Sequence, residues 1–147
     1  MSKRLGLFVM VVLLLCTASA VVSAKELSVS LPGNGGYTIT HGHSTGIVPL
    51  IVYNSITQGA TNWESKSVSS YITTLNVNLN WGNPSNSLQL TIYSPDGYVF
   101  GPYYDSSDGV TDGRIDLTIQ NSNGIAEGTW SYKVYGYSVS GTQTYSL

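Results

Sequence analysis

Apolar and polar residues alternate along much of this chain, and a period of two is typical of β-strands. The clearest run, residues 75–81, places two leucines, a valine and a tryptophan between three asparagines. Residues 88–93 alternate in the same way, and an Asn-Pro-Ser-Asn turn separates the two runs. We expect these runs to form two antiparallel strands that pair across the turn.

The rest of the chain carries the same signal, and no stretch of ten or more residues has the 3.6 period of a helix. A Ser-Pro-Asp-Gly turn follows the second run at 94–97, and an Asn-Ser-Asn-Gly turn lies at 121–124. Further strands are predicted at 98–100, 114–120 and 128–137, the last being the final strand, and less clearly at 27–31, 37–40, 47–53 and 63–68. The sequence therefore predicts an all-β fold, a jelly-roll-like antiparallel β-sandwich of roughly seven to nine short strands.

The first residues have the layout of a secretory signal peptide. Lys3 and Arg4 precede an apolar run at 5–16, and small residues follow it. The run is shorter than the roughly 20 residues that span a bilayer. We expect cleavage after Ala24, and cleavage after Ala20 or retention as an N-terminal anchor stay open. The protein is then secreted or held at the cell surface, with no membrane span after cleavage.

Cys16, the only cysteine of the chain, lies inside this predicted signal peptide. A lipoprotein would keep Cys16 as its acylated first residue, but Leu15 stands where such sites have a small residue. Cleavage leaves no thiol, which excludes disulfides and zinc–thiolate sites. Four basic and eight acidic residues remain, a net charge of −4. Nucleic-acid binding requires a basic face, so it is not expected.

From residue 58 onward the chain resembles the pre-peptidase C-terminal domain of secreted bacterial and archaeal proteins. The resemblance rests on Gln58-Gly59 followed by Trp63, on the strand at 75–81, on the block 88–97 ending in Pro-Asp-Gly, and on Gly-Thr-Trp and Val-Tyr-Gly within 128–136. It divides the chain into a signal peptide at 1–24, an N-terminal arm or extra edge strands at 25–57, and one β-sandwich at 58–147.

The resemblance implies a non-catalytic accessory module for attachment or surface assembly. Many members carry Asp-Leu-Asp before the Pro-Asp-Gly hairpin, whereas this chain has Ser87 and Gln89 at the polar positions. A cation role tied to those carboxylates is therefore not carried over to this chain.

Four aspartates gather in a glycine-rich stretch, and oxygen ligands on a loop suit calcium, which takes six to eight of them. The candidate ligands are Asp105, Asp108, Asp112 and Asp116. Their spacing does not match the helix-loop-helix calcium motif, which leaves a solvated loop whose aspartates cap turns as the alternative. His41 and His43, two residues apart, would share one face of a strand and could share a metal, but exposed loop histidines are the simpler interpretation.

The aromatic residues suggest a binding face. Six tyrosines fall at positions that the alternation places outward or in loops: Tyr93, Tyr98, Tyr103, Tyr104, Tyr135 and Tyr137. Exposed rings stack on sugars or anchor a protein partner, although cross-strand pairing on a sheet explains them equally well. The tryptophans Trp63, Trp81 and Trp130 are expected in the core.

No catalytic motif accompanies these residues: the chain has no Gly-x-Ser-x-Gly elbow, and neither histidine lies in a recognisable catalytic sequence. We therefore expect a protein that is not an enzyme and that contacts an extracellular protein or polysaccharide surface. The alternatives are a calcium-dependent or carbohydrate-binding module and a structural subunit that self-associates in a surface layer or filament.

Overall fold

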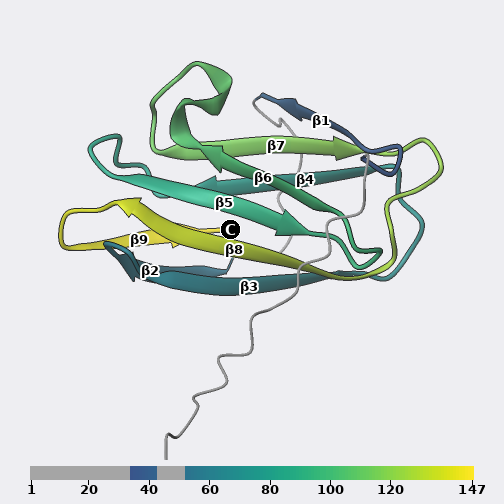
Figure 1. Cartoon of the computed structure of the whole chain (residues 1–147), viewed down its shortest axis with the longest axis horizontal. Helices are drawn as coiled ribbons and strands as arrows, with labels where there is room; N and C mark the ends of the chain where they lie inside the picture. The colour runs from purple at the N-terminus through teal and green to yellow at the C-terminus, as the bar shows by residue number, and fades with distance from the viewer. Residues whose placement is uncertain (1–33, 43–51) are drawn as a thin grey trace, which may run out of the picture.

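The computed structural model describes residues 34–42 and 52–147, and these residues form nine strands in two antiparallel sheets (Figure 1). The five-stranded sheet contains β1 (Thr38–His41), β2 (Tyr53–Thr57), β4 (Thr74–Asn80), β7 (Arg114–Gln120) and β9 (Thr142–Ser146), in the order β1-β7-β4-β9-β2. The four-stranded sheet contains β3 (Thr61–Val68), β5 (Ser87–Tyr93), β6 (Val99–Tyr104) and β8 (Gly128–Ser138), in the order β3-β8-β5-β6. A short 3₁₀ helix, η1 (Asp105–Asp108), follows β6.

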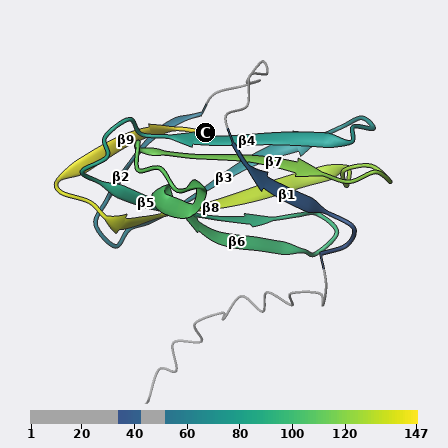
Figure 2. The ribbon, with the colours of Figure 1, turned by 90° about the horizontal axis from the view of Figure 1, so that it is seen from above.

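The two sheets pack face to face, and Figure 2 shows them as two layers seen edge-on. Alternate residues of the central strands point between the layers and are fully buried, as in Leu90 and Ile92 of β5, Leu117 and Ile119 of β7, and Trp130 of β8. Burial of this apolar surface is the main term that favours folding. The predicted all-β sandwich is therefore confirmed.

Several predicted elements are confirmed with their bounds or close to them. β7 coincides with the predicted strand 114–120, and β8 extends the predicted strand 128–137 by one residue. The turn at 94–97 joins β5 to β6 as an antiparallel hairpin, closed by the hydrogen bond from the Gly97 N–H to the Ser94 carbonyl. β6 continues to Tyr104, beyond the predicted 98–100.

The predicted pairing of 75–81 with 88–93 is wrong. β4 pairs with β7 and β9 in one sheet, whereas β5 pairs with β8 and β6 in the other. The turn between them crosses from sheet to sheet, and the buried indole of Trp81 stabilises this crossing by donating to the carbonyls of Asn83 at 3.0 Å and Asn86 at 2.9 Å. Alternation identifies each strand but does not identify its partner.

The prediction that 128–137 is the final strand is also wrong, because β9 follows it. The inward positions of β9 include Gln143, whose amide is buried and hides the alternation. This amide accepts from the Asn86 side chain at 2.7 Å and donates to the Trp81 carbonyl at 3.1 Å. A buried polar group is tolerated when it is hydrogen-bonded in this way, so β9 keeps a polar residue inside the sandwich.

The described part of the segment 25–57 contributes two edge strands, β1 and β2, to the five-stranded sheet. Tyr37, just before β1, is buried in the core with its ring 5.3 Å from that of Phe100 and 5.9 Å from that of Trp130. This side chain anchors the segment to the opposite sheet.

Residues 1–24, the predicted signal peptide, lie outside the described residues, as do the predicted strand 27–31 and most of 47–53. Within the described ranges, no helix has the length and hydropathy needed to cross a membrane.

Candidate binding surface

The outer faces of the two sheets differ in chemistry. The outward residues of the five-stranded sheet are mainly amides and hydroxyls, including Asn76 and Asn80 of β4 and Thr144 of β9, with Tyr53 as an exposed ring at its edge. The outer face of the four-stranded sheet carries five aromatic side chains, which we call the aromatic face: Trp63, Tyr93, Tyr104, Tyr135 and Tyr137.

Trp63 corrects one prediction. It was expected in the core with Trp81 and Trp130, which are indeed buried, but 47% of its surface is exposed. Along β3 the side chains at 61, 63, 65 and 67 point outward, and three of the four inward positions carry the polar residues Asn62, Glu64 and Lys66. This strand therefore lacks the alternation of apolar and polar residues from which the direction of a side chain can be read.

One end of the aromatic face is built around Trp63 and Tyr93. Their ring centroids lie 5.3 Å apart, although the strands β3 and β5 are separated by β8. The register explains this contact: Ser131 of β8 is the partner of Tyr93, and its small side chain leaves room for the rings to meet above it. The ammonium group of Lys133 lies 6.0 Å from the Trp63 ring centroid, at the outer limit of a cation–π contact.

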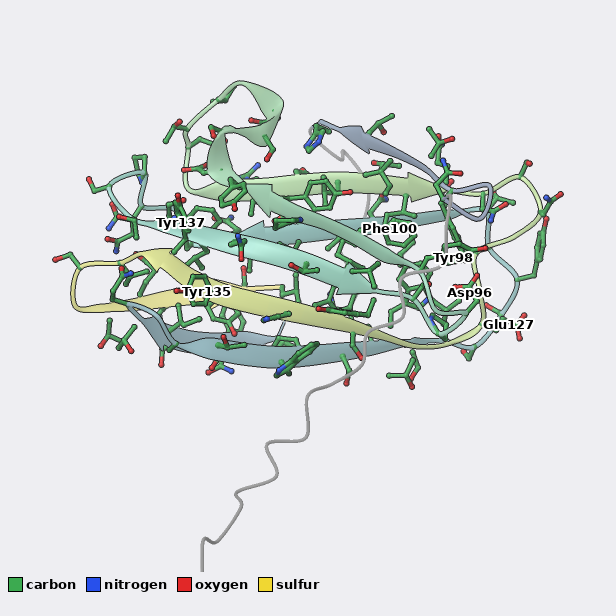
Figure 3. All side chains as sticks on the ribbon, in the orientation of Figure 1. Asp96, Tyr98, Phe100, Glu127, Tyr135 and Tyr137 are labelled. Atoms are coloured by element: carbon green, nitrogen blue, oxygen red, sulfur yellow. The ribbon has the colours of Figure 1, made fainter. Side chains whose placement is uncertain are left out.

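The other end of the aromatic face carries Tyr104 and Tyr137, whose rings meet edge to face with centroids 5.0 Å apart. Tyr137 is 52% exposed. The phenol oxygen of Tyr104 accepts a 2.6 Å hydrogen bond from the Gln89 side chain, which holds the ring in place. Figure 3 shows Tyr135 and Tyr137 on β8, at the end of the sandwich away from Asp96 and Glu127.

A pocket of about 440 Å³ opens beside this second pair. Tyr104 and Tyr137 line it together with hydroxyl-bearing residues, among them Ser87, Ser106 and Thr111. Its volume falls within the range of roughly 300–1,000 Å³ that is typical of small-molecule sites.

The other two predicted face residues, Tyr98 and Tyr103, lie elsewhere. Both are partly buried against the core. The ring centroid of Tyr98 lies 5.8 Å from that of Tyr37, and the ring centroid of Tyr103 lies 5.4 Å from that of the His41 imidazole. Burial raises the pKa of the Tyr103 phenol above its usual range. The sequence pattern alone does not show that these two rings point differently from Tyr104, because the pairing of β6 with β5 shifts register partway along the strand.

The carboxylate of Asp105 is buried and organises the loop before β7. It accepts hydrogen bonds from three successive backbone N–H groups, those of Asp112 at 3.2 Å, Gly113 at 3.1 Å and Arg114 at 3.2 Å. Asp105 is also one of the residues that line the pocket, and these three donors compensate the charge of its buried carboxylate. The Asp105 carboxylate therefore has a structural role, which is to hold the backbone of this loop.

Of the other three aspartates of the predicted calcium site, Asp108 and Asp116 have different hydrogen-bond partners. Asp108 is exposed and accepts from the Val110 N–H at 2.9 Å, and Asp116 is buried on β7 and accepts from the Asn78 amide at 3.1 Å. Among the described residues, no three or more histidine, cysteine or acidic side chains form a group that could hold a metal ion. Asp105 and Asp108 bond to backbone N–H groups of the loop, as the alternative of turn-capping aspartates expects, whereas Asp116 is paired with a side chain on a strand.

The predicted histidine pair cannot be placed as a pair. His41 is exposed at the end of β1, and His43 lies outside the described residues.

A polar network, which the sequence did not predict, closes the side of the sandwich between β2 and β3. The Glu64 carboxylate accepts from the Tyr145 hydroxyl at 2.7 Å and from the Asn54 amide at 2.9 Å, and the Asn62 amide donates to the Tyr145 oxygen at 3.0 Å. Burial, with the Glu64 hydrogen bond, raises the pKa of the Tyr145 phenol well above its usual range. Partial burial on the same strand lowers the pKa of Lys66.

Comparison with known proteins identifies one relative, whose description names no activity. No family model matches the chain. A protein of Archaeoglobus fulgidus, described as uncharacterized, is 43% identical over 60 residues, which is 40% of this chain and 84% of that protein.

Proposed function

We propose that this chain, which belongs to one family with the uncharacterized Archaeoglobus fulgidus protein, is a non-catalytic extracellular module that attaches to a protein or polysaccharide surface through its aromatic face. The observation that carries the proposal is the difference between the two sheets. Trp63 and four tyrosines share the outer face of one sheet, whereas the outer face of the other is mainly amide and hydroxyl.

Aromatic rings on a rigid sheet are well suited to contact a partner. They bury a large area and lose little conformational entropy, which is why they are enriched at binding sites. Trp63 favours this role in particular, because 47% of its surface is exposed on a strand that offers inward positions for a core residue. Cross-strand packing alone does not require a tryptophan to remain this exposed.

The edges of the four-stranded sheet give little support to the alternative of a structural subunit that assembles by strand pairing. In β3, Glu64 and Lys66 occupy inward positions at the edge of the four-stranded sheet. At the opposite edge, Pro102 in β6 lacks a backbone N–H. Inward charges and edge prolines are features that oppose strand addition. A face therefore fits the role of contact surface better than these edges do.

The resemblance to the pre-peptidase C-terminal domain points in the same direction, since it implies an attachment module. It stays a prediction from the sequence. Localisation outside the cell likewise depends on the predicted signal peptide.

Cosedimentation tests the proposal. The purified chain is mixed with cell envelopes of the producing organism and with insoluble cellulose, chitin and mannan, and the bound fraction is measured together with any reducing sugar released. We expect binding to at least one of these surfaces without release of sugar. Trp63→Ala and Tyr93→Ala should each lower the bound fraction at least fivefold.

Tyr53→Ala is the matched control, because Tyr53 is 79% exposed on the other sheet. It should bind like the wild type. Absence of wild-type binding to every surface, or equal losses in the Tyr53 and Trp63 variants, would overturn the proposed contact face. Release of sugar would overturn the non-catalytic role.

A further inference from the structure

We infer that the pocket beside Tyr104 and Tyr137 is a subsite for a neutral sugar, so that the surface to which the module attaches is an uncharged polysaccharide. This inference rests on the proposed function and names its ligand class. Its basis is the combination of two aromatic walls, a positioned phenol and a hydroxyl-rich lining in one pocket of about 440 Å³.

The aromatic walls provide the apolar contact that a sugar ring requires. A pyranose presents C–H groups on its faces and hydroxyls around its rim, so it is recognised by an aromatic ring with polar groups beside it. Tyr137 exposes half of its surface, and Tyr104 meets it edge to face. The two rings therefore present surfaces of different orientation to one ligand.

The polar lining supplies partners for the rim. Ser87, Ser106 and Thr111 line the pocket, and across the described residues their hydroxyls make no hydrogen bond to one another or to neighbouring groups. Each hydroxyl can both donate and accept, as sugar hydroxyls do.

Gln89 adds direction to the site. Its amide donates to the Tyr104 oxygen at 2.6 Å, so the phenol accepts there and keeps its own proton to donate to a ligand oxygen.

Charge decides between ligand classes. Neither lysine nor arginine lines the pocket in the described structure, so a phosphate, sulfate or uronate has no counter-charge. Asp105 is the one acidic lining residue of the described pocket, and its carboxylate is buried and occupied by the three backbone N–H groups of residues 112–114. A cation likewise finds no cluster of ligands there, because no metal-binding group occurs among the residues described. The remaining fit is an uncharged polyol.

Titration calorimetry with the full chain tests the inference. The probes are neutral oligosaccharides of glucose, mannose, galactose and N-acetylglucosamine, and acidic ones of galacturonic and glucuronic acid. We expect at least one neutral series to bind, and the acidic series to bind at least tenfold more weakly. Tyr137→Ala should weaken binding at least tenfold, and Tyr104→Phe, which keeps the ring and removes the donor, about fivefold.

Tyr71→Ala is the control, since Tyr71 is an exposed ring outside the strands. It should leave affinity unchanged, and thermal melting of each variant verifies that it is folded. Equal binding by Tyr137→Ala and the wild type, stronger binding of the acidic series, or no oligosaccharide binding at all would overturn the subsite. If Trp63→Ala still lowers the cosedimented fraction at least fivefold in those cases, the attachment function stands without the sugar subsite. If the wild type binds no surface, the attachment function itself fails.

Discussion

The hydroxyl of Tyr37 donates a 2.9 Å hydrogen bond to the carboxylate of Asp96, which lies 59 residues further along the chain. Tyr37 precedes the edge strand of one sheet, and Asp96 lies in the hairpin turn of the other. The same phenol oxygen accepts from the Ala126 N–H at 3.2 Å. One side chain therefore joins the N-terminal segment to two loops at one end of the sandwich.

Tyr37→Phe should destabilise the fold while keeping the buried ring. The variant loses the bond to Asp96 and leaves the Ala126 N–H without its acceptor, a cost of about 1–2 kcal/mol in the free energy of unfolding. Urea denaturation measures it. Tyr71→Phe is the control and should unfold at the wild-type midpoint. Equal midpoints for Tyr37→Phe and the wild type would mean that the segment before β1 is not held by this contact.

Alkaline pH should unfold the protein through its buried phenols. Burial and the Asp96 hydrogen bond raise the pKa of Tyr37 to about 12, from about 10 in an unfolded chain. Burial also raises the pKa of Tyr132. A raised pKa means that the folded state holds its proton more tightly, so this stability is complete below pH 10 and is lost as pH rises toward 12.

Thermal melting at intervals from pH 9 to pH 12 measures this loss. The melting temperature of the wild type should fall most steeply above pH 10. Tyr37→Phe should show a shallower fall over the same range, because it lacks one of the titrating groups. Parallel curves for the two proteins would contradict the raised pKa of Tyr37.

Asp105 should be the aspartate of the 105–116 stretch with the largest effect on stability. Asp105→Ala leaves three backbone N–H groups without their acceptor. Hydrogen bonds to charged groups contribute about 1.5–3 kcal/mol each, and water replaces part of this contribution in the variant. We therefore expect the free energy of unfolding to fall by about 3 kcal/mol. Asp108→Ala, which removes one exposed bond, should cost about 0.5 kcal/mol. Denaturant titration compares them, and similar losses would show that the Asp105 contacts do not organise the loop.

Iodide should quench the fluorescence of one of the three tryptophans. Trp63 is 47% exposed, whereas Trp81 and Trp130 are buried. We expect Trp63→Phe to remove most of the iodide-accessible emission and to change the unfolding free energy by less than about 0.5 kcal/mol. Quenching that persists in the variant would mean that another indole reaches solvent and that Trp63 is not the exposed ring of the aromatic face.

The sequence predicts the fold where alternation is strict and fails where polar residues point inward. The strand 114–120 is found with its bounds because Ile115, Leu117 and Ile119 all face the core. β9 is missed because Gln143 takes a core position, and the outward direction of Trp63 is missed because β3 has polar residues on both faces. In both strands, partners from distant parts of the chain satisfy the polar groups, and local pattern contains no information about them.

The binding surface was predicted in part for the same reason. The alternation identifies four residues that the structure brings to one face: Tyr93, Tyr104, Tyr135 and Tyr137. The pocket beside them combines residues from three separate stretches, 84–87, 104–111 and 137–138. Such a meeting depends on the strand order, which spacing along the chain does not reveal.

The strand order of the five-stranded sheet also determines when it can form. β9 lies inside that sheet between β4 and β2, and Ser146 meets Asn80 across 66 residues. Such long-range pairings give a high contact order and folding times in the range of milliseconds to seconds. The five-stranded sheet therefore cannot close before β9 has been synthesised and inserted, and until then β2 and β4 expose edges on which other chains can aggregate.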